Sequence, residues 1–233
     1  RTKDEAGNVS VLSNVIRIQT GPQSLRLTPR SGFIVHGPAY SPDGDWIAYA
    51  GWDLQTGVHG LWKIRTTGGE SISLSTIDAE MPTWTPDGRR IVFTHLFLQG
   101  QSYNADLWIT DVDGTNARLL LATPERERSP LVTPDGRSII FHSAGRILRM
   151  PIDGGEPELV TPVRCDHMAR FTLSPSGDRL AFTTEGDSLC VLDLSNGSIT
   201  VVEGLPRLQG NHLDWSPDGT RILFLRDHPP DGA

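Results

Sequence analysis

Ser41-Pro42-Asp43-Gly44 recurs along the chain as Thr85-Pro86-Asp87-Gly88, Thr133-Pro134-Asp135-Gly136, Ser174-Pro175-Ser176-Gly177 and Ser216-Pro217-Asp218-Gly219. The intervals between successive copies are 44, 48, 41 and 42 residues. A period of about 40 to 50 residues is typical of a four-stranded propeller blade and is too long for a leucine-rich repeat. Each copy suits a tight turn, because proline presets φ, aspartate bonds to nearby amides and glycine accepts a positive φ.

An apolar stretch follows each motif, as expected for the second strand of a blade. These stretches are Trp46 to Tyr49, Ile91 to Phe93, Ile139 to Phe141, Leu180 to Phe182 and Ile222 to Phe224. Third strands are predicted at Leu61 to Arg65, Leu107 to Val112, Ile147 to Ile152 and Ser188 to Leu194. Each runs into a glycine-containing hairpin turn before a fourth strand. The pattern predicts an all-β fold, a β-propeller of four-stranded antiparallel blades with five repeats.

The two ends of the chain leave the blade count open. The last repeat stops after its second strand, whereas the chain before Ser41 holds a third-strand and fourth-strand pair around Thr20-Gly21. The two ends could complete one blade and close a five-bladed ring, which would leave no free sheet edge. The alternative is that the chain is a fragment of a six-bladed ring.

The repeated order of apolar strand, Ser/Thr-Pro-Asp-Gly, second apolar strand and Asp-Gly or Gly-Gly hairpin resembles the TolB-like propeller repeat, which is WD-repeat-like. The resemblance covers residues 21–233, which we assign to the propeller. Members of this class include TolB, the propellers that cover prolyl-oligopeptidase-type hydrolases, and many surface or periplasmic proteins of bacteria. The resemblance implies a fold, and one fold hosts many functions. It also implies a periplasmic or extracellular location.

The first twenty residues carry a second resemblance. Asp4-Glu5-Ala6-Gly7-Asn8-Val9-Ser10 followed by Ser13-Asn14-Val15-Ile16 is similar to the final hairpin of a fibronectin type III domain. Residues 1–20 are therefore expected to be either a strand of the closing blade or the tail of a fibronectin type III-like domain. Both alternatives point to a protein outside the cytoplasm.

Composition excludes several classes of partner. The net charge of −7 argues against a ligand held through phosphates, so no nucleic acid is expected. No apolar stretch approaches the ~20 residues that a membrane helix needs, so no membrane insertion is expected. Cys165 and Cys190 are too few for a disulfide framework, and Cys190 is expected to be a buried thiol, with one bridge between the two as the alternative. We expect a monomer.

Enzyme motifs are absent from the sequence. It has no Gly-x-Ser-x-Gly elbow, no His-Glu-x-x-His and no Walker loop. We therefore expect a non-catalytic binding or scaffold propeller of an exported bacterial protein, with a protein or glycan partner. The alternative is the propeller of an enzyme, either the lid of a prolyl-oligopeptidase-type hydrolase or a metal-dependent oligosaccharide lyase.

Candidate ligand-binding residues lie close to the position five residues before each turn motif. In a propeller, the loops there surround the channel mouth, and loops on a rigid scaffold commonly carry function. The arginines could donate to an anionic or sugar ligand and the carboxylates could accept. The alternative is that all of them only solvate the channel. The candidates are His36, Glu80, Arg128, Asp166, Arg170 and His212.

Three histidines would become neighbours if the ring closed, because repeats one, four and five would then adjoin. They are His36, His167 and His212. A metal held by such a set resembles the arrangement in propeller-fold oligogalacturonate lyases. The spacing is not a metal-ligand motif, so exposed or satisfied histidines are the preferred interpretation, and no metal or cofactor is expected.

Aromatic residues suggest a second kind of contact. The longest loops expected between second and third strands, 52–59 and 95–106, contain Trp52, Phe97 and Tyr103. Aromatics on a polar face suit contact with a protein or glycan, and the alternative is that they pack over their own blades. Four other tryptophans recur at matching places in the repeat and are predicted to lie in the core between blades, namely Trp62, Trp84, Trp108 and Trp215.

Overall fold

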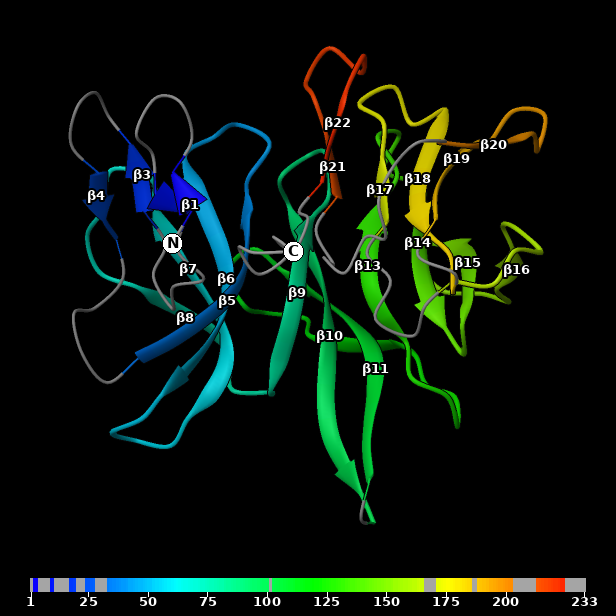
Figure 1. Ribbon diagram of the computed structural model, residues 1–233. Helices are drawn as coiled ribbons and strands as arrows, with labels where there is room; N and C mark the ends of the chain where they lie inside the picture. The colour runs from blue at the N-terminus through cyan, green and yellow to red at the C-terminus, as the bar shows by residue number, and fades with distance from the viewer. Residues whose placement is uncertain are drawn as a thin grey trace, which may run out of the picture. The chain divides into compact units, whose positions relative to one another are not determined.

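The chain forms β-sheets that divide into two compact units. The computed structural model describes residues 2–3, 9–10, 17–19, 24–27, 33–100, 102–165, 171–185, 188–202 and 213–224. Residues 1–98 with 108–118 form the first unit, and 99–107 with 119–233 form the second. Every regular element in the described ranges is a β-strand (Figure 1). No helix within these ranges has the length and apolar character to cross a membrane.

The first unit contains one complete four-stranded antiparallel sheet, in the order β5-β6-β7-β8. Its strands are β5 (Phe33–Tyr40), β6 (Trp46–Asp53), β7 (His59–Arg65) and β8 (Ile72–Ser75). A second sheet has the order β12-β11-β10-β9, and the division between the units falls within it. Its strands are β9 (Ala79–Trp84), β10 (Arg90–Gln99), β11 (Ser102–Asp111) and β12 (Arg118–Leu121).

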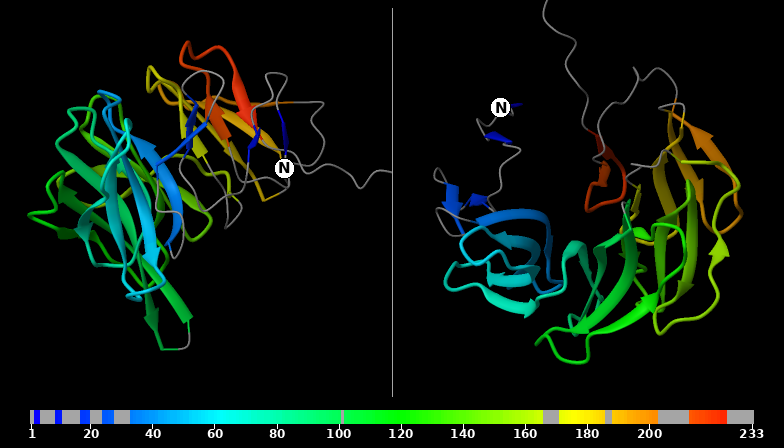
Figure 2. Two further views of the ribbon diagram at one scale, coloured as in Figure 1. Left: turned by 90° about the vertical axis from the view of Figure 1, so that its left-hand side faces the viewer. Right: turned by 90° about the horizontal axis from the view of Figure 1, so that it is seen from below.

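The sheets of the second unit have the same order of strands. Figure 2 shows the strands from two further sides. One sheet consists of β13 (Arg128–Val132), β14 (Ser138–Ser143), β15 (Arg146–Pro151) and β16 (Glu158–Leu159). The next consists of β17 (Phe171–Leu173), β18 (Arg179–Thr183), β19 (Leu189–Asp193) and β20 (Ile199–Val201). The last is the antiparallel pair of β21 (Leu213–Trp215) and β22 (Ile222–Phe224). The prediction of four-stranded antiparallel blades is confirmed.

Two further strand pairs lie near the N-terminus. β1 (Thr2–Lys3) pairs with β2 (Val9–Ser10), and β3 (Arg17–Gln19) pairs with β4 (Ser24–Arg26), both antiparallel. The β3–β4 pair is the hairpin expected around Thr20-Gly21. The closure of one blade by the two ends of the chain stays a prediction, as do the fibronectin alternative and the domain bounds.

The turn motif joins the first and second strands through a small set of hydrogen bonds. The Ser41 hydroxyl donates to Asp43 Oδ1 at 2.5 Å and accepts the Trp46 N–H at 2.9 Å. Asp43 Oδ1 also accepts the Asp45 N–H at 3.0 Å. Gly44 has a φ of 76°, a conformation that glycine adopts without steric cost. The same hydroxyl-to-carboxylate bond occurs from Thr85, Thr133 and Ser216.

The fourth repeat has Ser176 where the others have aspartate, and a neighbouring residue takes over its role. Asp178 Oδ1 accepts hydrogen bonds from Ser174 Oγ at 2.8 Å and from Ser176 Oγ at 2.5 Å. The Arg179 N–H still donates to Ser174 Oγ at 3.0 Å. A carboxylate two residues further along the chain therefore preserves the turn.

Consecutive sheets pack face to face within each unit. In the second unit, Ile140 and Ile147 pack with Phe171 and Phe182 of the next sheet. In the first unit, Trp84 Nε1 donates to the Ala39 carbonyl of the preceding sheet at 3.0 Å. In the second, Trp215 Nε1 likewise reaches the Thr172 carbonyl at 3.2 Å. The four recurring tryptophans are buried or half-buried in these apolar clusters, as predicted, at Trp62, Trp84, Trp108 and Trp215.

The prediction of a long loop at 95–106 is wrong. β10 continues to Gln99 and β11 begins at Ser102, so the segment is an extended hairpin with a short turn, the longest in Figure 1. The loop at 52–59 is also shorter than expected, since β6 ends at Asp53 and β7 begins at His59. Backbone pairing extends beyond the buried apolar core that marked each strand in the sequence.

The turn bonds give a test of what stabilises a blade. Thr133 is 7% exposed, and its hydroxyl donates to Asp135 and accepts the Ser138 N–H. Thr133→Val is expected to lower the free energy of unfolding by about 1–3 kcal/mol, because it leaves a buried N–H without its acceptor. Thr133→Ser keeps the hydroxyl and is expected to lose about 0.8 kcal/mol for the missing methyl group. Urea unfolding measures both, and an unchanged free energy of unfolding for Thr133→Val would show that the hydroxyl contributes nothing.

Candidate functional site

The first strand of three successive sheets carries the same β-bulge. Between His36 and Ala39, between Glu80 and Thr83, and between Arg128 and Leu131, the pairing with the second strand shifts. Two residues of the first strand oppose one aromatic residue of the second at each place, and this residue is Tyr49, Phe93 or Phe141. All three aromatics are fully buried.

The first bulge residue has a positive φ in every case. Its φ is 56° at Gly37, 50° at Met81 and 54° at Ser129. The second bulge residue is always proline, Pro38, Pro82 or Pro130, which suits an unpaired position because proline has no N–H to donate. Bulges often lie beside functional sites, where they redirect a side chain.

The residue just before each bulge is one of the predicted channel-mouth residues. His36 is exposed on β5 opposite Ala50, and Glu80 is half-buried on β9 opposite Thr94. Arg128 is half-buried on β13 opposite His142. His36, Glu80 and Arg128 therefore occupy equivalent positions in the repeat. The other candidates, Asp166, His167, Arg170 and His212, lie outside the described residues.

The predicted aromatic contacts have different surroundings. Trp52 stacks on His59 with ring centroids 4.5 Å apart, and Phe97 stacks on His95 at 5.2 Å. Both are half-buried, so they pack on their own sheets. Tyr103 is 57% exposed. Of the three, Tyr103 has the exposure that a protein or glycan contact needs.

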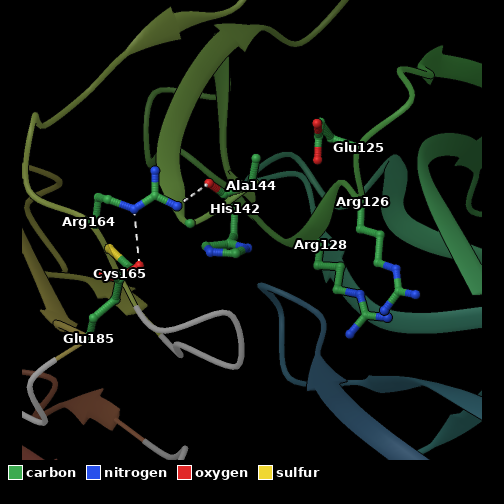
Figure 3. A pocket seen from close by; sticks show the side chains of 9 residues that line it. Glu125, Arg126, Arg128, His142, Ala144, Arg164, Cys165 and Glu185 are labelled. Atoms are coloured by element: carbon green, nitrogen blue, oxygen red, sulfur yellow. Dashed lines mark hydrogen bonds and ion pairs between the residues drawn. The ribbon is translucent and has the colours of Figure 1, made fainter.

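A pocket of about 580 Å³ in the second unit contains Arg128 (Figure 3). Arg128 and His142 are cross-strand partners at one end of β13 and β14. The lining is mostly charged, and its polar members are Glu125, Arg126, Arg128, His142, Arg164 and Glu185. The other described residues that line it are Ala144, Gly145 and Cys165. Of these residues, sequence reasoning found only Arg128 as a ligand candidate.

One wall of the pocket is internally paired. Arg164 Nε donates to Glu185 Oε1 at 3.0 Å, and Arg164 Nη2 donates to the Ala144 carbonyl at 3.2 Å. Both side chains of the ion pair are more than half exposed, so the pair adds little to stability. It does fix the guanidinium of Arg164 in place, as the dashed lines in Figure 3 mark.

A buried carboxylate lies behind the pocket. Glu127 is fully buried, and its Oε1 accepts hydrogen bonds from Thr123 Oγ1 at 2.5 Å and Ser143 Oγ at 3.2 Å. Burial raises the pKa of Glu127, and the charge of Asp106 acts in the same direction. Because Glu127 lies between Arg126 and Arg128 in the chain and Ser143 follows His142, its bonds hold the two sides of the pocket together.

The pocket cysteine is not prepared for nucleophilic chemistry. Cys165 is fully buried, and burial raises its pKa to about 12. A thiol acts as a nucleophile only as the thiolate, which is scarce here at neutral pH. Cys190 is also buried as predicted, and both cysteines are free thiols.

The described part of the chain contains no group of three or more His, Cys, Asp or Glu side chains that could hold a metal ion. Of the three histidines weighed as a metal set, only His36 belongs to this part. The histidine hypothesis is therefore untested at His167 and His212.

Comparison with known proteins identifies the repeat. The family model described as TolB beta propeller domain matches residues 19–232. The uncharacterized protein Atu1656 of Agrobacterium fabrum is 26% identical over 207 residues, which are 81% of this chain and 69% of that protein. The uncharacterized peptidase YuxL of Bacillus subtilis is 30% identical over 109 residues, which are 44% of this chain and 16% of that protein.

A solved structure shows the same fold. TolB from Acinetobacter baumannii superposes with a TM-score of 0.69 at 21% identity, over 89% of this chain. The match covers 52% of the TolB chain, so this chain spans about half the length of that protein.

The packing of the first bulge against the next sheet can be tested by substituting Gly37 with alanine. A Cβ on Gly37 would lie 3.2 Å from Met81 N and 3.4 Å from Pro82 Cδ, whereas a Cβ on Gly57 would have nothing within 4 Å. Both glycines have a positive φ, so alanine at either should cost about 1–2 kcal/mol in backbone strain. Gly37→Ala is expected to be the more destabilising in urea unfolding. A loss no larger than that of Gly57→Ala would mean that the contact with the next sheet is loose.

Glu127 gives a prediction for pH dependence. Its pKa is raised above 4.5 in the folded state, so its contribution to stability is full below the unfolded-state pKa and is lost as pH rises through the folded pKa. Glu127→Gln is therefore expected to flatten the fall in unfolding free energy above pH 4.5. Urea unfolding at a series of pH values measures this, with exposed Glu156→Gln as the control. Parallel curves for wild type and Glu127→Gln would contradict it.

Proposed function

We propose that this chain, which belongs to the TolB β-propeller domain family, works by binding a protein or glycan partner rather than by catalysis. The observation that carries the proposal is the pocket of the second unit. Arg126, Arg128 and His142 line it together. Pockets of roughly 300–1,000 Å³ with a few convergent polar groups are the usual form of a ligand site. Export to the periplasm or cell exterior is part of the proposal and rests on the family resemblance.

The chemistry of the pocket supports binding over catalysis. The Cys165 thiol stays protonated at neutral pH because its pKa is about 12. The Glu127 carboxylate is fully buried and accepts hydrogen bonds from two hydroxyl groups, so it is turned away from solvent. The groups that line the space are long, charged side chains suited to hydrogen bonding and ion pairing.

A second candidate function is the propeller of a hydrolase. It is favoured by the 30% identity to YuxL, named a peptidase, over 109 residues of this chain. In that case the catalytic residues would belong to another part of a longer protein, and this chain would guard or select substrate.

The test is binding by the purified chain to a peptide array and an oligosaccharide array. We expect saturable binding to a subset of one array, and loss of that binding in Ala144→Trp, which places an indole in the pocket. Glu156→Trp is the matched control, because Glu156 is exposed and does not line the pocket. Absence of binding to both arrays would contradict the proposal, as would turnover of peptide or ester substrates by the chain alone.

A further inference from the structure

Two arginines of the pocket have no ion-pair partner among the described residues. Arg126 and Arg128 are two residues apart in the segment that enters β13, and both line the pocket. In Figure 3 their guanidinium groups point in the same direction. Neither guanidinium makes an ion pair with a described residue, and the buried Nε of Arg128 makes no hydrogen bond to one. A buried N–H without an acceptor is costly, and two like charges beside one space repel each other.

Among the described lining residues, the unpaired positive charge is confined to Arg126 and Arg128. Arg164 on the opposite wall already has Glu185 and the Ala144 carbonyl as partners. Glu127, between the two free arginines in the chain, is bonded to Thr123 and Ser143. The pocket therefore offers guanidinium donors without their acceptor, in a chain whose net charge is −7.

The charges of the lining favour a monoanion. Among the described residues, three arginines and two glutamates line the pocket, and their charges sum to one net positive charge. Guanidinium groups bind carboxylate and phosphate in a bidentate manner. A phosphate dianion would exceed the net charge and be repelled by Glu125 and Glu185, whereas a carboxylate matches it.

The shape and composition of the lining favour a peptide over a sugar acid. No described tryptophan, tyrosine or phenylalanine lines the pocket, so its described lining offers no large flat apolar surface for a ring to lie on. Capture of a C-terminal carboxylate is a recurring mode of peptide recognition. A volume of about 580 Å³ is enough for the last residues of a chain.

From these observations we propose that Arg126 and Arg128 bind the C-terminal carboxylate of a partner polypeptide. The inference rests on the proposed function, in which the pocket binds a ligand, and it names the chemical group that is recognised. One carboxylate oxygen accepts from the terminal N–H groups of each guanidinium. Glu125, at another edge of the pocket, is placed to accept hydrogen bonds from amides of the same peptide end.

The experiment compares two peptide libraries that differ only at the C-terminus. Random hexapeptides tethered through their N-termini carry either a free carboxylate or a carboxamide, and binding of the whole chain is measured. We expect binding to a subset of the carboxylate library and at least about a ten-fold loss for the same sequences as carboxamides, as for a charged hydrogen bond. A uronate-containing oligosaccharide and a phosphopeptide set are measured in parallel.

Substitutions of the two arginines test which side chains bind the carboxylate. Arg126→Gln and Arg128→Gln are each expected to weaken carboxylate binding about ten-fold or more. Arg128→Lys keeps the charge but loses the planar fork, so it is expected to weaken binding as well. Arg137→Gln is the control, since Arg137 is exposed and lies outside the pocket. Unchanged melting temperatures establish that the variants fold.

The outcomes separate the two proposals. Equal binding to carboxylate and carboxamide peptides, or binding unaffected by Arg126→Gln and Arg128→Gln, would overturn the carboxylate assignment and leave the binding function standing. Preference for the uronate or the phosphopeptide would overturn the assignment to a peptide C-terminus. No binding to any peptide or oligosaccharide would overturn both the assignment and the proposed function.

Discussion

The hydrogen bond from a serine or threonine hydroxyl to a nearby aspartate carboxylate is the interaction on which each blade depends. The hydroxyl also accepts the N–H of the residue that starts the second strand, so one side chain joins turn and strand. The pKa values of the turn aspartates are lowered mainly by this bond, which keeps them ionised as acceptors. Asp178 performs the same role in the repeat that lacks the usual aspartate.

The turn motif fixes the register between the first and second strands of a blade. This register determines where the β-bulge lies in the first three sheets. With the second strand fixed at the motif, a buried aromatic residue faces two residues of the first strand, and a positive φ with a following proline accommodates the extra residue. The residue before the bulge then occupies an equivalent place in each sheet while its identity varies among histidine, glutamate and arginine. The backbone position is repeated from sheet to sheet, but the side chain at that position differs. Such differences allow a repeat fold to form a particular ligand site.

The pocket combines a buried, hydrogen-bonded base with exposed charge at its surface. Glu127 ties the entry of β13 to the end of β14 through Thr123 and Ser143, whereas Arg126 is exposed and has no partner among the described residues. A buried, hydrogen-bonded base limits the motion of the strands beneath the arginines, so the binding that we propose would require less ordering of the protein. The acidic chain as a whole would repel anions, and the pocket offers a local exception.

The sequence by itself determined the repeat, the strand order within a blade, the turn chemistry and the buried tryptophans, because these depend on local spacing and on residues with strict backbone preferences. It also placed His36, Glu80 and Arg128 at equivalent positions of the repeat. It did not reveal Glu125, Arg126, His142, Arg164 and Glu185 as one pocket, since their meeting depends on cross-strand register and on contact between successive sheets. The proline three residues before each of the first three turn motifs was a signal for the bulge, but its meaning required the paired strand. Which charges are neutralised and which are free is decided only by tertiary structure, because an ion pair depends on distance in space and not along the chain.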